Sequence, residues 1–334
     1  MSTTWVTIQF ILIAIILGYS GFKLSFLADQ IAYKTKLGRN LIGIIMLSTV
    51  TSLPELVTGI SAVTITDNPD LAVGDILGGC SFNLATVVLL DSIYRKGSVF
   101  SHSTQGHMFT GLIGMIMISL VGLSLILKNE NWFNLHSIGI SSIFIFVFYF
   151  AGMRAIYNFE VSNIVKSIEP IADKGLTKDL ILFGFYAIMI VVSGIFLPKT
   201  AEDIIHLVGW NSAFVGTFLM ALATTLPEIS VTISALRLNA AELAFSNLLG
   251  SNIFNVVILA ITDVFYKKGP LFASVAETHS VTAFSLLMMI ALVLIALMKP
   301  PQKKFLNIIS GLSFIILGIY IVTIVINFKG SLTD

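Results

Sequence analysis

The sequence predicts an all-α polytopic membrane protein, with ten transmembrane helices arranged as two inverted five-helix repeats. Three observations predict this fold. The 334-residue chain is 56% hydrophobic and only 11% charged, whereas an ordinary soluble domain is about 25% charged. Ten apolar runs are long enough to cross a bilayer. A pair of motifs occurs twice, once in each half of the chain.

The ten apolar runs are separated by charged or Gly/Pro-rich breaks. They cover residues 6–27, 38–63, 70–92, 106–127, 132–153, 179–198, 211–236, 241–265, 278–298 and 305–327. The longest hydrophilic connection, residues 154–178, separates five runs from five. We therefore expect a first repeat at 1–153, a linker at 154–178 and an inverted second repeat at 179–334.

Charged residues predict the orientation. Thirteen Lys and Arg lie in the connections after odd-numbered spans, and five lie on the opposite side. Because cytoplasmic loops carry the excess of positive charge, we expect both termini outside and the 154–178 linker in the cytoplasm. The first span lacks the flanks of a signal peptide and is expected to be retained. Asp91 and Asp263, at span ends beside basic residues, are expected to form surface ion pairs.

The two halves of the chain resemble each other in register. The stretch TSLPELVTGISAV from Thr51 matches TTLPEISVTISAL from Thr224 at an offset of 173 residues. LGGCSFN from Leu77 matches LGSNIFN from Leu249 at an offset of 172 residues. Because each unit holds an odd number of spans, the second copy enters the membrane in the opposite sense. Inverted repeats of this kind occur in many secondary transporters.

Each copy of the first motif places a glutamate beside a proline inside an apolar span. Pro54 and Pro227 cannot donate a backbone hydrogen bond, so each helix is expected to break and leave carbonyl oxygens free at mid-membrane. A carboxylate at that depth is costly, which indicates that Glu55 and Glu228 are functional. Together with neighbouring hydroxyls they form hard oxygen ligands of the kind that Ca²⁺ prefers. The hydroxyls are those of Thr51, Ser52, Thr224 and Thr225.

The third and eighth spans each carry a polar stripe, because three positions spaced by four residues share one face of a helix. The stripes consist of Asp75, Gly79 and Asn83 in the third span, and of Asn247, Ser251 and Asn255 in the eighth. In hydrocarbon, such a stripe is expected to face a polar partner. No histidine lies near the helix breaks and Cys80 is the single cysteine, so a soft-metal site is not expected.

These motifs resemble the two α-repeats of the calcium/cation antiporter superfamily, which includes the sodium/calcium exchangers. TSLPE and TTLPE match its G-T-S-L-P-E core, and LGSNIFN matches its second signature. The resemblance implies antiport of Ca²⁺ against Na⁺, by alternating access at a midplane site with Glu55 and Glu228 as central ligands. The first and sixth helices would slide past this core. The further ligands implied are Thr51, Ser52, Thr224, Thr225, Ser251, Asn83 and Asn255, with carbonyls near Ser48 and Ala221.

The chain departs from the family pattern in ways that bear on selectivity. Val50 and Ala223 replace the glycine that opens the core, and Gly79 replaces the serine of the second signature. Asp75 stands where the family usually has Asn. Asp75 is therefore a candidate third carboxylate of the metal site, with a buried structural hydrogen bond as the alternative. These departures leave Ca²⁺/H⁺ exchange, or exchange of another divalent cation, as an alternative activity.

Other classes of protein are disfavoured. The net charge of +1 and the lack of basic clusters give no reason to expect a nucleic-acid partner. An intramembrane protease would need a histidine base for the motif GYSG at residues 18–21, but the five histidines lie in loops or near span ends. A cation channel is the different-class alternative, which the inverted repeat disfavours. We expect that the protein is not an enzyme and needs no cofactor. We expect it to function as a monomer in a lipid bilayer, in an inner membrane of prokaryotic type. The expected ions are Ca²⁺ and Na⁺, with H⁺ as a further candidate.

Overall fold

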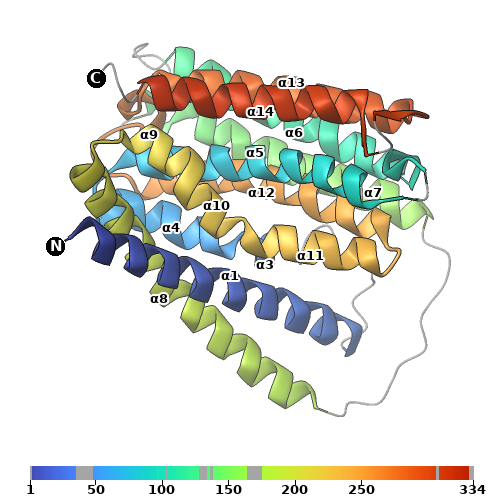
Figure 1. Cartoon of the computed structure of the whole chain (residues 1–334), viewed down its shortest axis with the longest axis horizontal. Helices are drawn as coiled ribbons and strands as arrows, with labels where there is room; N and C mark the ends of the chain where they lie inside the picture. The colour runs from blue at the N-terminus through green and yellow to red at the C-terminus, as the bar shows by residue number, and fades with distance from the viewer. Residues whose placement is uncertain are drawn as a thin grey trace.

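The structure is a computed structural model of the chain, and it is almost entirely helical. It describes residues 2–34, 48–95, 97–102, 104–127, 134–135, 138–163, 175–305 and 308–330. Figure 1 shows the long helices packed along one common direction, with the start of α1 and the end of α14 at the same end of the bundle.

In the first half, the described residues form four long helices and a helix interrupted near Ser52. Its elements are α1 (Thr3–Lys34), α3 (Ser48–Thr51), α4 (Leu53–Thr64), α5 (Pro69–Ile93), the 3₁₀-helix η2 (Val99–His102), α6 (Gln105–Ile126), β1 (Asn134–Leu135), β2 (Ile138–Gly139) and α7 (Ile140–Asn163). Strands β1 and β2 pair antiparallel as a short hairpin.

The elements of the second half include a counterpart, in the same order, of each element described in the first half. They are α8 (Leu176–Val208), α9 (Ser212–Phe214), the π-helix η4 (Val215–Met220), α10 (Ala221–Thr224), α11 (Leu226–Arg237), α12 (Ala241–Phe265), the 3₁₀-helix η5 (Leu271–Ser274), α13 (Thr278–Met298), β3 (Lys304–Phe305), β4 (Ile309–Ser310) and α14 (Gly311–Gly330). Strands β3 and β4 form a second antiparallel hairpin.

Eight helices in the described ranges are long and apolar enough to cross a membrane, and a bent pair raises this number to nine. The eight are α1, α5, α6, α7, α8, α12, α13 and α14. The bent pair joins Ser212–Thr224 to Leu226–Arg237 at an angle of 46°. The expected second span, 38–63, begins outside the described residues and continues as α3 and α4, so the total of ten helices stays a prediction.

The expected spans 241–265 and 278–298 coincide with α12 and α13. The expected starts of the fifth and tenth spans were wrong, because a hairpin precedes each helix. As a result α7 begins at Ile140 instead of 132, and α14 begins at Gly311 instead of 305. At its other end α7 continues to Asn163, into the expected linker.

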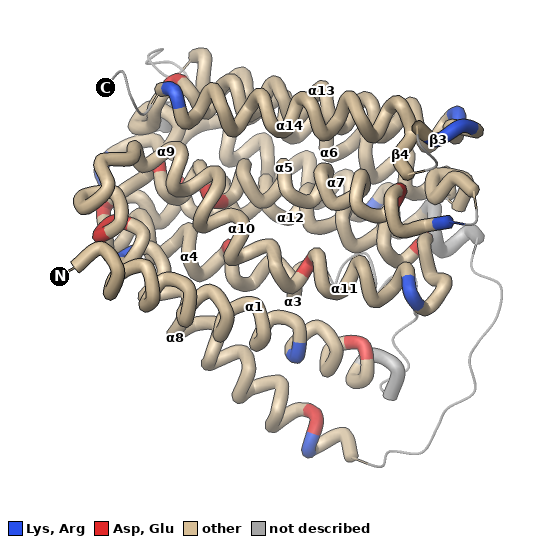
Figure 2. The backbone as a smooth tube through the Cα atoms, in the orientation of Figure 1, with Lys and Arg blue, Asp and Glu red and all other residues tan. Residues whose placement is uncertain are grey.

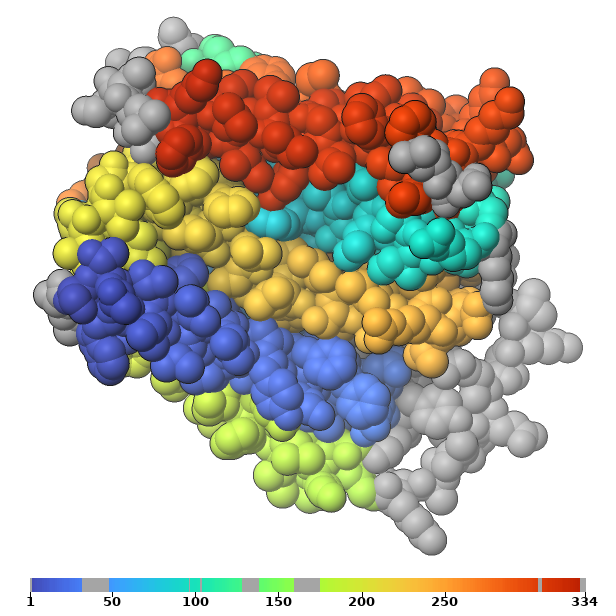
Figure 3. All heavy atoms as spheres, in the orientation of Figure 1, coloured from blue at the N-terminus to red at the C-terminus, as the bar shows by residue number. Residues whose placement is uncertain are grey.

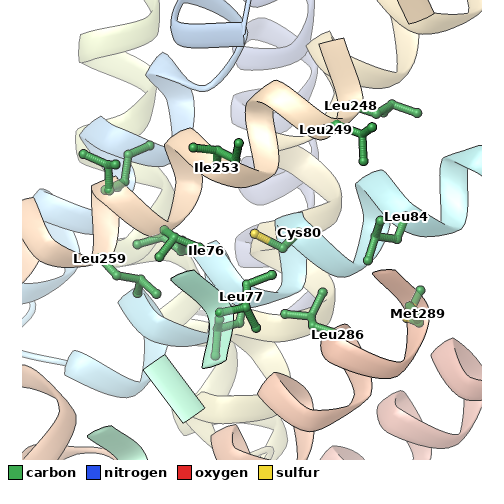
Figure 4. Packing of buried hydrophobic residues seen from close by; sticks show 14 of the residues in the cluster. Ile76, Leu77, Cys80, Leu84, Leu248, Leu249, Ile253, Leu259, Leu286 and Met289 are labelled. Atoms are coloured by element: carbon green, nitrogen blue, oxygen red, sulfur yellow. The ribbon is translucent and has the colours of Figure 1, made fainter. Parts of the chain in front are cut away.

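The centre of the bundle is formed by α5 and α12, whose residues are mostly buried. Apolar side chains of α5, α12 and α13 pack around Cys80 (Figure 4). Helices α1 and α8 lie side by side on one flank (Figure 1). Figure 3 shows the side chains of α1, α9–α11 and α14 packed closely over one face of the molecule. Many apolar side chains of α1, α8 and α14 are exposed, as expected for helices that face lipid.

Helix α5 packs very closely on η4. A Cβ atom on Gly78 would lie 2.4 Å from the carbonyl oxygen of Thr217 and 2.6 Å from the Cβ of Ala221. Glycine permits this approach because it has no side chain, and small residues are typical of close helix contacts in membranes. The contact holds the second broken helix against α5 just before Thr224.

Asp91 and Asp263 are buried, so the expected surface location was wrong. Asp91 does form an ion pair, but a buried one, with Lys304 Nζ at 3.1 Å from its Oδ1. The carboxylate of Asp263 accepts hydrogen bonds from the Gly139 N–H at 2.9 Å and from the Ser142 hydroxyl at 2.5 Å, where α7 begins. The carboxylate of Asp91 accepts an N–H and a hydroxyl in the same way where α14 begins. Each aspartate therefore anchors the hairpin of the other half. The basic residues beside each aspartate in the sequence did not indicate this contact.

Candidate functional site

Two acidic residues lie where the broken helices resume. Figure 2 shows most Lys and Arg toward the ends of the helices, while Asp and Glu also occur midway along the bundle. Glu55 lies in the first turn of α4, after Pro54, and Glu228 lies in the first turn of α11, after Pro227. Both glutamates are fully buried. The positive end of each helix dipole therefore lies at a glutamate and favours its negative charge.

Both expected helix breaks are present. Ser52 separates α3 from α4, and Thr225 separates α10 from α11. The carbonyl of Ser48 accepts bonds from the Ser52 N–H and the Thr51 hydroxyl, both at 3.1 Å. The carbonyl of Ala221 accepts from the N–H of Thr225 at 3.0 Å and from its hydroxyl at 2.6 Å. These carbonyls are thus engaged by hydrogen bonds, and their role as cation ligands stays a prediction.

Three of the four carboxylate oxygens of Glu55 and Glu228 have no hydrogen-bond partner in the part of the chain that the structure describes. The fourth, Oε1 of Glu228, accepts a bond from the Ser52 hydroxyl at 3.0 Å. Ser52 lies at the first break, so this bond joins the two broken helices. Buried carboxylate oxygens without partners are costly, and a cation bound beside them would offset that cost.

The polar stripes of α5 and α12 lie beside the breaks. The Thr51 hydroxyl oxygen is 3.2 Å from that of Ser251. A Cβ atom on Gly79 would lie 3.3 Å from Thr225 Oγ1, 3.4 Å from Asn255 Nδ2 and 3.7 Å from Glu55 Oε1. Polar groups from α4, α12 and the second break therefore converge at this point of α5.

The side-chain amides of the two stripes differ in their hydrogen-bond partners. Asn83 donates to the Oδ1 of Asn252 at 3.1 Å, which links α5 to α12. The side chain of Asn255 has no hydrogen-bond partner among the described residues. All three amides are buried. Every residue of the expected set is buried, and Asp75 is joined to the set by its hydrogen bond with Thr224.

Asp75 differs from the two glutamates because both of its carboxylate oxygens accept hydrogen bonds. Oδ2 accepts from the Thr58 hydroxyl at 2.5 Å, and Oδ1 accepts from the Thr224 hydroxyl at 2.9 Å. Its counterpart in the second half, Asn247, instead donates to the Thr232 hydroxyl at 3.1 Å. Asp75 therefore makes the buried hydrogen bonds considered as the alternative, while direct contact with a cation stays a prediction.

Thr58 and Asn252 belong to this network but were not expected as site residues. Thr58 lies one turn after Glu55 on α4, so helical spacing from the acid could have indicated it. Asn252 lies inside the LGSNIFN motif, but its bond to Asn83 depends on how α5 crosses α12. Spacing along one helix carries no signal for that crossing.

The region supplies the hard oxygen ligands that Ca²⁺ and Na⁺ require. Within the described ranges, no three His, Cys, Asp or Glu side chains are grouped so that they could hold a metal ion. A cation at the two glutamates would therefore need hydroxyl, amide or carbonyl oxygens to complete the roughly six to eight ligands of Ca²⁺. Such oxygens are present beside both glutamates.

A protein-family model described as "Sodium/calcium exchanger protein" matches residues 5–153 and 178–329 of the chain. Inner membrane protein YrbG of Escherichia coli K12 is 26% identical over 247 residues, which cover 72% of this chain and 74% of YrbG. The sodium/calcium exchanger MaX1 of Methanosarcina acetivorans is 33% identical over 122 residues, which cover 36% of this chain and 33% of MaX1.

The fold is similar to that of the sodium-calcium exchanger NCX_Mj. A structure soaked with 2.5 mM Na⁺ and 10 mM Sr²⁺ is 20% identical in sequence and superposes with a TM-score of 0.64, over 97% of this chain and 99% of that chain. A structure soaked with 10 mM Na⁺ and zero Ca²⁺ gives 21% identity and a TM-score of 0.64, over 96% and 98% of the two chains. At these identities the likeness shows the fold.

Proposed function

The chain belongs to the sodium/calcium exchanger protein family, and we propose that it is a secondary active antiporter that exchanges Ca²⁺ for Na⁺. One observation carries this proposal. Glu55 and Glu228 are fully buried at the starts of two broken helices, and three of their four carboxylate oxygens lack a hydrogen-bond partner among the described residues. Two such carboxylates neutralise one Ca²⁺. Hydroxyls, amides and carbonyls complete its ligands, and no cofactor is required.

The proposed architecture has ten transmembrane helices in two inverted five-helix repeats, with both termini outside and the monomer as the functional unit. The matching order of elements supports this: a broken helix, a buried polar helix and a hairpin followed by a helix occur in each half. The ends of the described chain lie at the same end of the bundle, as an even number of crossings requires (Figure 1). The inner membrane is the proposed location, by similarity to YrbG.

Exchange follows from competition for the same charge. Ca²⁺ or Na⁺ can neutralise the two glutamates, but full occupancy by both is disfavoured because like charges repel strongly in a low dielectric. Alternating access would come from sliding of α1 and α8. Their packing supports this, since α1 contacts α8 and α11, while α8 also contacts α4. Each sliding helix thus crosses one half of the site.

Transport in proteoliposomes tests the proposal. We expect Ca²⁺ uptake driven by an outward Na⁺ gradient, and its loss in Glu55→Gln and in Glu228→Gln. The matched control is Glu242→Gln, because Glu242 is exposed in the first turn of α12. Uptake equal to wild type in either site variant would contradict the proposed ligands.

The same assay separates the alternatives. Uptake that follows a pH gradient and ignores Na⁺ would assign Ca²⁺/H⁺ exchange. Flux of equal size without any counter-ion would indicate a cation channel. A reporter fused in the 154–178 linker and found on the non-cytoplasmic side of the membrane would contradict the proposed orientation.

A further inference from the structure

Thr51 and Thr224 occupy equivalent positions before the two prolines, but their hydroxyls have different partners. The Thr51 hydroxyl faces α12, where it meets the Ser251 hydroxyl at 3.2 Å. The equivalent partner of Thr224 on α5 would be residue 79, which is glycine. The Thr224 hydroxyl donates instead to Oδ1 of Asp75, at 2.9 Å.

Two residues distinguish α5 from the pattern of α12, and both affect the hydroxyl of Thr224. Gly79 removes the side chain that corresponds to Ser251, and Asp75 lies four residues earlier, one helical turn away on the same face. Asp75 replaces the amide that stands as Asn247 in the second half. Where Asn247 donates to Thr232, Asp75 accepts from both Thr58 and Thr224.

We propose that Asp75 is a positioning residue. It is the hydrogen-bond partner that orients the Thr224 hydroxyl, as Ser251 is the partner that orients the Thr51 hydroxyl. A carboxylate is an acceptor only, so it fixes the Thr224 hydroxyl as a donor toward α5. The lone pairs of the Thr224 oxygen are then left for the cation. Asp75 thus acts through Thr224 and compensates for the hydroxyl missing at Gly79. This inference rests on the proposed function, and it names a residue of the first half that orients a hydroxyl of the second half in the same site.

The geometry separates this role from that of a third cation ligand. Both carboxylate oxygens of Asp75 are occupied by hydroxyl donors, whereas both oxygens of Glu55 have no hydrogen-bond partner in the described structure. Thr58 also donates to the Pro54 carbonyl at 2.9 Å, so it has a second acceptor. Thr224 likewise has bonds of 3.2 and 3.3 Å to carbonyls of its own helix, to which it would turn if Asp75 were removed.

The test compares three variants by the Ca²⁺ concentration that gives half-maximal uptake. Asp75→Ala removes the acceptor, and we expect that concentration to rise about tenfold, as for the loss of one hydrogen bond to a charged group. Asp75→Asn keeps an oxygen that can accept from Thr224, and we expect a rise of less than about threefold. Asp75→Ala combined with Gly79→Ser supplies the hydroxyl found at Ser251, and we expect most of the loss to be restored.

A ligand role for Asp75 gives the opposite pattern. If Asp75→Asn is impaired as strongly as Asp75→Ala, the charge is what matters and the proposal is overturned. It is also overturned if Gly79→Ser fails to improve Asp75→Ala. Where Asp75→Ala does not fold, Asp75→Ser replaces it, because a short hydroxyl binds back to its own helix instead of reaching Thr224.

A readout without transport separates this proposal from the proposed function. Wild-type protein that fails to exchange Ca²⁺ for Na⁺ would contradict the function only. The proposal on Asp75 is then tested by the unfolding temperature in detergent, measured without added Ca²⁺ or Na⁺. We expect the change in the double variant to differ from the sum of the changes in Asp75→Ala and Gly79→Ser. Additive effects on that temperature would overturn the compensation between the two residues.

Discussion

Gly21 on α1 faces the proline of the second broken helix, and an added methyl group there has a calculable effect. A Cβ atom on Gly21 would lie 2.3 Å from Cγ and 2.9 Å from Cβ of Pro227. Carbon atoms in ordinary contact are about 3.5–4.0 Å apart, so Gly21→Ala creates an overlap of roughly 1.2 Å at the nearer atom. The proline ring is closed onto the backbone, so its Cβ and Cγ atoms can move only by a change of ring pucker or together with the backbone.

The overlap is expected to lower the free energy of unfolding by about 1–3 kcal/mol, the usual cost of overpacking. Relief requires that α1 move outward or that Pro227 shift. Because Glu228 follows Pro227 directly, a shift of the ring also moves the carboxylate. We therefore expect the rate of Na⁺-driven Ca²⁺ uptake to fall about tenfold, which corresponds to about 1.4 kcal/mol.

Two measurements check the effect of Gly21→Ala: the unfolding temperature in detergent and the uptake rate in proteoliposomes. The matched control is Gly184→Ala on α8, since no heavy atom lies within 4 Å of the Cβ that it would add. Gly184→Ala is expected to unfold at the wild-type temperature or slightly above it, since it replaces a glycine inside a helix, and to match the wild-type uptake rate. If Gly21→Ala behaves like this control, the packing of α1 on the broken helix does not constrain exchange, and the reasoning fails.

Three further predictions concern side chains outside the glutamate pair. Asp263→Ala is expected to lower the free energy of unfolding by about 3 kcal/mol, because two N–H donors and a hydroxyl lose their acceptor. Ser142→Ala should lower the free energy of unfolding by about 1 kcal/mol. Equal losses for Asp263→Ala and Ser142→Ala in chemical denaturation would contradict the anchoring role of Asp263. Asn83→Ala and Asn252→Ala break the same bond, so a double-mutant cycle of unfolding should give a coupling of about 1 kcal/mol, whereas additive losses would exclude it. Lys268→Ala should leave the unfolding temperature unchanged, because the side chain is 66% exposed and its aspartate partner is exposed as well; a shift of several degrees would refute this.

Much of the helical fold could be predicted because apolar runs of sufficient length have few structural solutions in a membrane. The bounds of α12 and α13 coincide with the expected spans, since charged or Gly/Pro-rich segments end both runs. The break at each proline was predictable from the missing N–H donor. The duplicated motif also indicated which residues lie beside the breaks, since it placed Glu55 and Glu228 at equivalent positions.

Other features depend on contacts between distant segments. The hairpins before α7 and α14 involve two-residue strands, too short for alternation of apolar and polar residues to be visible in the sequence. Asp91 was expected at the surface because Arg95 and Lys96 follow it closely, yet its carboxylate is buried against Ser310 and Ser313. Neighbours in sequence do not reveal that an acid at the end of one helix is covered by a hairpin of the other half.

Asp75 and Gly79 show why ion selectivity cannot be assigned from a site's residues one at a time. Considered singly, Gly79 removes a hydroxyl from the first half of the site and Asp75 adds a carboxylate, which would change both the number of ligands and their charge. In the structure the carboxylate is turned toward Thr224 and Thr58, and Oδ1 supplies the acceptor that Thr224 lacks at Gly79. Thr51 and Thr224 thus each have a polar partner on the long helix of the other half, while the added negative charge is held by two donors.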